Sequence, residues 1–199
     1  MAGKGYNFES EIEDFFLEME NKNKHTPLLV FDERGFLKVN RSFRVPASGA
    51  MDSIKGDIIT ANEKFTRQFK VECKSRLEKT KRDGQIVHAE KEWITKNERE
   101  AKEDNQVPVL CFSFKRVQKN RIWWLMKEED FKAYIYHEEC YLGSPEVIKP
   151  KQSKKKDVLT FILKDLKSGY YCFEDKELCG KYILSSHVLF KWALERRFM

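Results

Sequence analysis

The sequence predicts a mixed α/β domain in which helices flank a central β-sheet. Of its 199 residues, 41% are hydrophobic and 13% aromatic, which favours a globular chain with a sizeable core. Apolar residues recur at helical spacing in some segments and alternate with polar residues in others. These segments follow one another as a helix, strands, a helix, further strands and a small α/β tail.

The chain begins with a predicted helix in which apolar residues share one face at helical spacing. These residues are Phe8, Ile12, Phe15, Phe16 and Met19. Two β-like segments, 27–31 and 36–45, follow around the turn-like sequence DERG. Segment 46–56 contains Gly, Ser and Pro and indicates a loop.

The middle of the chain supplies two predicted strands, 56–60 and 67–75, and a helix over 87–104. The sequence between the two strands, ANEKFTR, contains no tight-turn dipeptide, so we expect a longer loop there. Two more strands, 107–116 and 121–127, are followed by a short amphipathic helix. This helix spans residues 128–139.

Beyond Cys140 the composition changes. Segment 142–157 holds two prolines and a lysine run and indicates a solvated loop. The remaining predicted elements are strands over 158–166 and 170–175 and a helix over 185–197. We therefore expect residues 1–140 to form the core and residues 141–199 to form a small α/β C-terminal extension packed on it.

Charge and cysteine content set the expected environment. Lys and Arg outnumber Asp and Glu by 38 to 32, and the resulting charge of +6 suits a polyanionic partner without requiring one. Five cysteines without a CxxC pair indicate a reduced, intracellular chain. No apolar run approaches the ~18 residues that span a bilayer, and the N-terminus has no signal region. We expect a cytoplasmic protein without a membrane partner, located in the host cytoplasm if its source is viral.

The segment FKVECKS, residues 69–75, places a carboxylate and an ammonium on one face of a strand. Because side chains alternate in a strand, Glu72 and Lys74 share a face while Cys73 points into the core. Asp57 precedes Glu72 by fifteen residues, and a hairpin between the two strands would set the two carboxylates opposite each other. Two such carboxylates suit Mg²⁺, and the backbone carbonyl of Cys73 could reach the same ion.

This pattern predicts the chemistry of a metal-dependent nuclease. A bound metal ion activates water and offsets charge on a phosphodiester. Lys74 would stabilise the developing negative charge or orient the attacking water. The simpler interpretation is an exposed sheet face, on which an ion pair between Glu72 and Lys74 contributes little.

The stretches KGYNFES, RVPASGA, KGDIIT and VECKSR together resemble the archaeal-type Holliday junction resolvases of the PD-(D/E)XK nuclease superfamily. The family pattern has Gly and Glu on the first helix, Arg before a Ser-Gly loop, a metal-binding Asp and Glu-x-Lys-Ser. The matching positions are Gly5, Glu9, Arg44, Ser48, Gly49, Asp57, Glu72, Lys74 and Ser75. The resemblance covers roughly the first 130 residues and is strongest up to Arg76.

The resemblance implies a restriction-endonuclease-like core and a homodimer in which each subunit uses Mg²⁺, with Mn²⁺ able to substitute, to nick one strand of a four-way DNA junction. Glu9 then joins Asp57 and Glu72 at the metal, and Ser48 contacts a substrate phosphate. The alternative interpretations are a helix N-terminal acid for Glu9, with Glu13 on the same face, and a turn residue for Ser48. Arg44 is either a DNA contact or an ordinary strand-edge charge.

Two positions depart from the family pattern. Gly56 stands where the superfamily has Pro before the metal-binding Asp. No Gln occupies a confident position on the helix after Glu-x-Lys, and Lys91 or Lys96 could face the site instead. That role stays unassigned.

Basic residues directly follow the predicted site. From Lys74 to Arg82 the chain has five basic residues and one acid, a cluster that favours phosphate contacts and salt-dependent DNA binding. The predicted DNA contacts are Arg44, Ser48, Arg76, Lys79, Lys81 and Arg82. Trp123 and Trp124 are expected to divide between the core and a helix or dimer contact.

The sequence leaves three functions open. The first is a Mg²⁺-dependent endonuclease that resolves four-way junctions. The second is a PD-(D/E)XK endonuclease of restriction, flap or single-strand specificity, because short motifs do not encode junction recognition. The third is a DNA-binding module of the same fold without catalysis.

Overall fold

The protein is described by a computed structural model that covers residues 6–45, 56–76, 86–114, 121–136, 143–151, 157–163 and 169–198. Its centre is a six-stranded sheet with the strand order β5-β7-β8-β12-β11-β9. The strands are β5 (Phe69–Arg76), β7 (Val107–Phe114), β8 (Ile122–Lys127), β12 (Gly180–Ser186), β11 (Tyr170–Asp175) and β9 (Glu146–Val147). β5 runs parallel to β7 and β9 parallel to β11, whereas the other neighbours are antiparallel.

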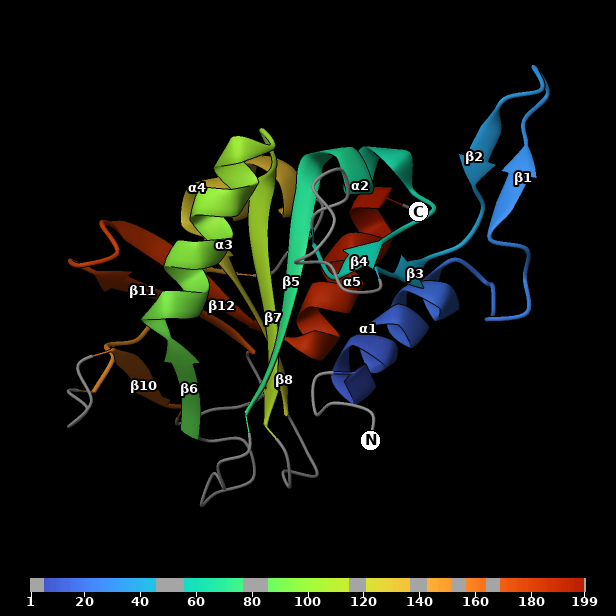
Figure 1. The fold of residues 1–199 in the computed structure, drawn as a ribbon. Coiled ribbons are helices and arrows are strands. Elements are labelled where there is room, and N and C mark those ends of the chain that lie inside the picture. The colour runs from blue at the N-terminus through green and yellow to red at the C-terminus, as the bar shows by residue number, and fades with distance from the viewer. Residues whose placement is uncertain are drawn as a thin grey trace.

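Helices cover both faces of this sheet, which confirms the predicted mixed α/β fold (Figure 1). On one face α1 (Tyr6–Met19), α2 (Glu63–Gln68) and α5 (His187–Phe198) enclose a core that contains Phe16 and Trp124. On the other face α3 (Lys91–Glu103) and the pair β6–β10 enclose a second core that contains Leu110 and Trp123. Trp123 and Trp124 are both fully buried, so neither forms the dimer contact considered for them.

The segment predicted as one helix over 87–104 contains two elements. Ile86–Glu90 forms β6, which pairs antiparallel with β10 (Val158–Ile162), and α3 starts only at Lys91. Val87 and Ala89 alternate with half-buried residues, and pairing with a strand about 70 residues away overrides the helical pattern. The helix predicted over 128–139 is described only up to residue 136. It begins as α4 (Glu128–Asp130) and continues as a π-helix over Phe131–Ile135.

The last sixty residues contribute strands to the central sheet itself. β12 and β11 lie between β8 and β9, so strands from both sides of position 140 belong to one sheet. β12 was not anticipated from the sequence, and Glu146–Val147 forms the edge strand β9 within the segment expected to be a loop. The central sheet therefore contains strands from both sides of residue 140. The expected division into a core and a C-terminal extension stays a prediction.

Two small antiparallel pairs precede β5. β3 (Phe43–Arg44) pairs with β4 (Ile58–Ile59), and β1 (Leu29–Phe31) pairs with β2 (Leu37–Val39) in a ribbon that projects from the body (Figure 1). The loop expected between the strands of Asp57 and Glu72 is occupied by α2, so these strands do not form a simple hairpin. Across the described parts of the chain, no helix is both long and apolar enough to cross a membrane.

Candidate active site

Asp57 lies against the middle of β5 although the predicted hairpin does not form. Its backbone N–H donates to the carbonyl of Val71 at 2.8 Å, and its Oδ2 accepts the backbone N–H of Cys73 at 2.7 Å. These two contacts flank Glu72, so the two acids come together as expected by another route. Asp57 is 6% exposed, and the N–H bond to its carboxylate compensates for this burial.

Gly56 explains why this chain lacks the proline expected before the acid. Its φ of +93° is a conformation that proline, with φ fixed near −65°, does not adopt. A Cβ at this position would also lie 3.3 Å from the carbonyl oxygen of Val71. The glycine thus permits the close approach that brings Asp57 to β5.

Glu72 and Lys74 lie on β5 at the edge of the sheet. Glu72 is 7% exposed, and the ammonium of Lys74 forms an ion pair with its Oε1. Burial by itself lowers the pKa of Lys74, but the carboxylates of Glu72 and Asp57 outweigh burial and raise this pKa above its usual value. Lys74 is therefore a stable cation among acids, and these side chains are not the fully exposed pair of the simpler interpretation.

Glu9 of α1 faces the same group of charges. Its Oε2 lies 3.9 Å from Nε of Arg44. Burial raises the pKa of Glu9, and so do the nearby carboxylates of Asp57 and Glu72, while Arg44 and Lys74 act in the opposite direction. Charged residues of α1, β3 and β5, together with Asp57 directly before β4, thus lie within electrostatic reach of one another.

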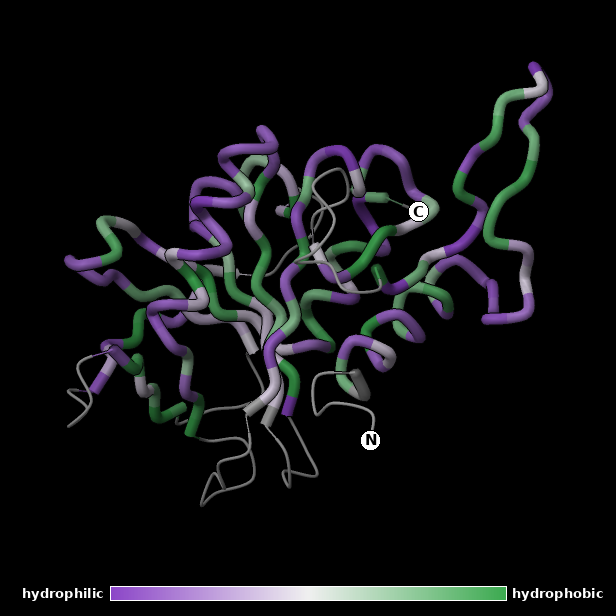
Figure 2. The backbone as a smooth tube through the Cα atoms, viewed as in Figure 1, coloured by the Kyte–Doolittle hydropathy of each residue, from purple (hydrophilic) through white to green (hydrophobic). Residues whose placement is uncertain are grey.

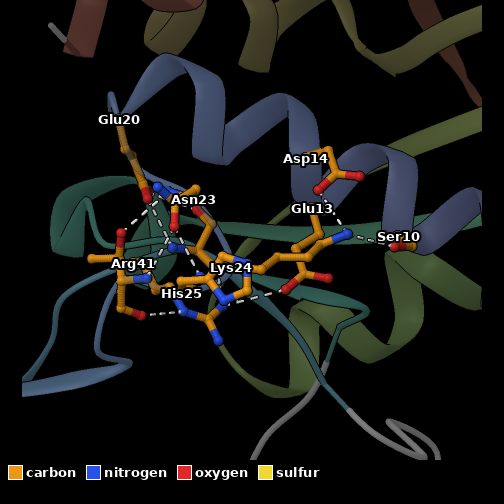
Figure 3. A network of polar contacts seen from close by, with 10 residues as sticks. Ser10, Glu13, Asp14, Glu20, Asn23, Lys24, His25 and Arg41 are labelled. Atoms are coloured by element: carbon orange, nitrogen blue, oxygen red, sulfur yellow. Dashed lines mark hydrogen bonds and ion pairs between the residues drawn. The ribbon is translucent and has the colours of Figure 1, made fainter.

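Glu13, the other acid on this face of α1, has different partners. Its Oε1 lies 3.4 Å from Nη1 of Arg41, near the ion pair between Asp14 and Lys24 (Figure 3). The structure therefore distinguishes two acids that helical periodicity leaves equivalent. Glu9 is the one that accompanies Asp57.

The side chain of Cys73 points into the core beneath α1, as strand alternation predicts. Burial raises the pKa of this thiol well above its usual range, so the thiol stays protonated. Any contribution of Cys73 to a metal site would come from its backbone, as the sequence pattern indicates. Its backbone N–H is already committed to Asp57.

The donor set fits an open Mg²⁺ site better than a closed cage of side chains. In the described part of the chain, no three or more His, Cys, Asp and Glu side chains are grouped so as to hold a metal ion. Mg²⁺, however, often binds one or two carboxylates and takes its other ligands from water and substrate phosphate. The buried carboxylates of Asp57 and Glu72, with Glu9 nearby, meet that requirement.

An ion pair of a buried lysine lies on the same face of β5 and was not found from the sequence. Lys70 is 2% exposed and forms an ion pair with Oε2 of Glu100 on α3. Burial raises the pKa of Glu100, but the hydrogen bond and charge of Lys70 outweigh burial and the pKa is lowered. Alternation placed Lys70 beside Glu72, but nothing local indicated a partner thirty residues away.

The lysines considered for the missing glutamine have other partners. Lys91 contacts Asp175 at 3.1 Å and Glu177 at 2.5 Å, at the start of α3. Lys96 lies 3.7 Å from Glu100. None of these partners is Asp57 or Glu72. The role that the superfamily gives to a glutamine on this helix therefore stays unassigned.

Several predicted site residues lie outside the described residues. These are Ser48, Lys79, Lys81 and Arg82. Arg76 ends β5, but its side chain is not described. Their assignment to DNA contact stays a prediction, as does that of Arg44, which pairs with Glu9.

The sequence was compared with models of known protein families. A family model with the description "Phage putative PDDEXK endonuclease" matches residues 2–170. The chain belongs to this family. The match contains Glu9, Asp57, Glu72 and Lys74 and continues to the start of β11, well past residue 140. No curated protein and no solved structure shows significant similarity to the chain.

Membership in this PD-(D/E)XK endonuclease family supports the broader part of the sequence interpretation and leaves the finer part untested. It supports the superfamily and the restriction-endonuclease-like core, but it does not point to the archaeal Holliday junction resolvases in particular. The protein is a nuclease of the PD-(D/E)XK type, and its substrate class is DNA. Nucleases of this type generally use divalent metal ions.

Proposed function

We propose that this PD-(D/E)XK nuclease is a Mg²⁺-dependent endonuclease that cuts branched DNA, resolving four-way junctions as a cytoplasmic homodimer by paired phosphodiester hydrolysis. One observation carries the catalytic part of the proposal. Asp57 is hydrogen-bonded to the residues on both sides of Glu72, and Glu9 and Lys74 lie around the two acids. The junction specificity rests on the motif resemblance from Gly5 to Arg76.

Asp57 and Glu72 are the residues that would hold Mg²⁺, with Glu9 and the backbone of Cys73 beside them. When bound, the metal ion supplies an activated water and offsets charge on the phosphodiester. Mn²⁺, which also prefers oxygen ligands, would substitute.

The protein groups have separate tasks. Lys74 keeps its proton because of the surrounding carboxylates, so it presents a positive charge where negative charge develops on the phosphate. Arg44 offsets the charge of Glu9 beside the other two carboxylates. Ser48 and the basic residues Arg76, Lys79, Lys81 and Arg82 would bind substrate phosphates.

A second candidate function has comparable support. The description of the matching family names an endonuclease and no particular DNA structure, so an endonuclease of restriction, flap or single-strand specificity on the same active site is equally compatible with it. Junction specificity requires two active sites at a fixed separation, and no short motif encodes this. The non-catalytic DNA-binding module is disfavoured, because Asp57, Glu72 and Lys74 are all present.

The deciding experiment uses an immobile four-way junction with each strand labelled in turn, beside linear duplex, single-stranded and flap DNA. Each substrate is incubated with Mg²⁺, with Mn²⁺ or with chelator. We expect paired, symmetric nicks near the branch point, with metal only. Equal cutting of linear or flap DNA would move the function to the second candidate, and no cutting of any DNA would favour the non-catalytic module.

Variants test the residue assignment in the same assay. Asp57→Asn keeps an oxygen that accepts the N–H of Cys73 but removes the charge, so we expect a folded protein whose cleavage rate falls at least ~10²-fold. DNA binding, measured by fluorescence anisotropy, should persist. Glu9→Gln should slow cleavage, while Glu13→Gln on the same helix should not. Equal effects of the last two would remove Glu9 from the site.

A further inference from the structure

A buried lysine lies on β5 directly before the proposed metal site. Figure 2 shows hydrophilic and hydrophobic residues alternating along β5, so Lys70, Glu72 and Lys74 share one side of the strand. Glu72 and Lys74 have tasks in the proposed function. Lys70 is 2% exposed, and its ammonium forms an ion pair with Glu100 of α3 instead of reaching toward the site.

The stem of Lys70 lies beside the residue that precedes Asp57. Its Cγ is 3.5 Å from the position that a Cβ on Gly56 would occupy. Gly56 has a φ of +93° and forms the turn that brings Asp57 to β5. Because Lys70 points toward α3, its stem limits the movement of this turn away from β5 on the α3 side.

Three nearby residues of β5 thus contact the two residues Gly56 and Asp57. The stem of Lys70 lies beside Gly56, and the carbonyl of Val71 accepts the backbone N–H of Asp57 at 2.8 Å. The backbone N–H of Cys73 donates to Oδ2 of Asp57 at 2.7 Å. The two hydrogen bonds fix Asp57 along the strand, and the stem of Lys70 supports the turn before it.

Glu100 anchors the far end of the Lys70 side chain. A lysine stem is flexible, and an unpaired ammonium in the core is strongly unfavourable, so the ion pair determines where this stem lies. Oε1 of Glu100 is also 3.7 Å from Lys96, one turn earlier on α3. The carboxylate is therefore shared by two lysines, and Lys70 connects α3 to Gly56.

We propose that Lys70 is a positioning residue of the metal site: its stem, anchored by Glu100, keeps Gly56 in place and thereby holds the carboxylate of Asp57 beside Glu72. Lys70 acts through these residues and contacts neither metal nor substrate. Supporting residues of this kind keep ligands within ~0.5 Å of the geometry that binding requires. The inference rests on the proposed function only in that Asp57 and Glu72 bind the metal ion.

The first test follows the position of Asp57 without metal or DNA. The amide of Cys73 is protected from hydrogen exchange while Asp57 accepts its N–H, so its exchange rate, measured by NMR on the full chain, reports the release of Asp57. Lys70→Ala removes the stem and should accelerate this exchange at least ~10-fold relative to the amides of β8. Lys70→Met keeps an apolar stem of similar length and should change the rate less than ~3-fold.

The second test measures Mn²⁺ binding to the full chain by isothermal titration calorimetry in the absence of DNA. Lys70→Ala should raise the dissociation constant at least ~10-fold, and Lys70→Met should stay within ~3-fold of the wild type. Phe161→Leu is the matched control for lost packing. It alters the core that faces α3, but from β10, which is not part of the central sheet, and should change neither Mn²⁺ binding nor the relative exchange of Cys73.

A third comparison tests the anchor. Glu100→Ala leaves the ammonium of Lys70 unpaired, so the side chain should leave the core and release the turn at Gly56. Exchange of Cys73 should accelerate and Mn²⁺ binding should weaken. Adding Lys70→Met to Glu100→Ala should reverse both changes, because an apolar stem stays buried without an ion pair.

Two results would overturn the inference: exchange of Cys73 in Lys70→Ala no faster than in Phe161→Leu, or equal effects of Lys70→Ala and Lys70→Met. Failure of the proposed function is seen separately. A wild type that binds Mn²⁺ no better than Asp57→Asn would remove the metal from that proposal. The exchange of Cys73 needs no metal and still decides whether Lys70 positions Asp57.

Discussion

The sheet edge at β5 and the β1–β2 ribbon place residues in opposite environments. At the sheet edge Lys70, Asp57 and Glu72 are charged and buried, whereas in the β1–β2 ribbon Phe31 and Leu37 are apolar and exposed. Both arrangements are unfavourable unless a partner compensates them. At the sheet edge the chain supplies the partners itself, through ion pairs and a backbone N–H.

The two regions differ in whether the chain itself supplies the compensating partner. The charged side chains of β5 are held by partners within the protein, and such pre-organisation is what the proposed binding of a metal ion and a phosphate requires. The apolar face of the β1–β2 ribbon has no such partner among the described residues and is exposed to solvent. The following predictions test this contrast, from the largest expected effect to the smallest.

Among the changes at the sheet edge, removing the partner of the buried Lys70 should have the largest effect on stability. Glu100→Ala leaves the ammonium of Lys70 unpaired in the core and should lower the free energy of unfolding by ~3 kcal/mol. Urea unfolding followed by tryptophan fluorescence measures this loss. Adding Lys70→Met should restore most of the stability, and Glu63→Ala, which breaks an exposed pair with Arg67, should change it by less than ~1 kcal/mol. Equal losses for Glu100→Ala and Glu63→Ala would contradict the prediction.

Acid should destabilise the core beside α1 through His187. The indole N–H of Trp124 donates to Nδ1 of His187 at 3.0 Å, and burial lowers the pKa of this histidine to about 4, helped by Lys191 and Arg121 and opposed by Glu18. The unfolded chain binds this proton near pH 6.5, so stability is present above that pH and is lost as the pH falls toward 4.

Between pH 8 and pH 5 this one group should lower the free energy of unfolding by up to ~2 kcal/mol. His187→Gln keeps an acceptor for Trp124 but cannot be protonated, so its stability should depend less on pH in this range. Denaturant titrations of both proteins at several pH values measure the difference. If the stabilities of the wild type and of His187→Gln depend on pH in the same way, His187 has the same pKa in the folded and the unfolded chain, and the prediction is wrong.

Two of the glycines with positive φ, Gly56 beside the sheet edge and Gly35 in the β1–β2 ribbon, allow a direct comparison of the two regions. Gly56 has φ +93°, and a Cβ added there would lie 3.3 Å from a carbonyl oxygen, whereas Gly35 has φ +79° and open space around it. Gly56→Ala should lower stability by ~1–3 kcal/mol and impair cleavage, because Asp57 follows directly. Gly35→Ala should have a smaller effect on global unfolding. Thermal melts of the two variants decide the order.

The β1–β2 ribbon should contribute least to the stability of a single chain. At concentrations where the monomer dominates, Phe31→Ser should change the free energy of unfolding by less than ~0.5 kcal/mol. Phe16→Ala in the core should lower it by ~3–5 kcal/mol. A large effect of Phe31→Ser on the monomer would mean that the β1–β2 ribbon packs on its own chain.

Much of the fold follows from local pattern. Alternation in 67–75 and the helical spacing of Phe8 to Met19 predicted β5 and α1, because one-sided burial imposes these periods, and the short apolar run in 121–127 predicted the fully buried strand β8. Pairing partners were harder to predict. Residues 86–90 look helical in sequence and become a strand only because β10 lies beside them, and β12 takes a central position that no local signal indicates.

The candidate site divides in the same way. The sequence by itself determined the residue types and spacing of Glu9, Asp57, Glu72 and Lys74, because the chemistry of a metal and a phosphate requires those side chains. Only the tertiary structure decided that Glu9 rather than Glu13 faces Asp57 and that a positive φ at Gly56 brings this acid to β5. It also decided that Glu100 neutralises Lys70. These outcomes depend on contacts between distant segments, whose geometry is set by packing of the whole chain and not by any short stretch of it.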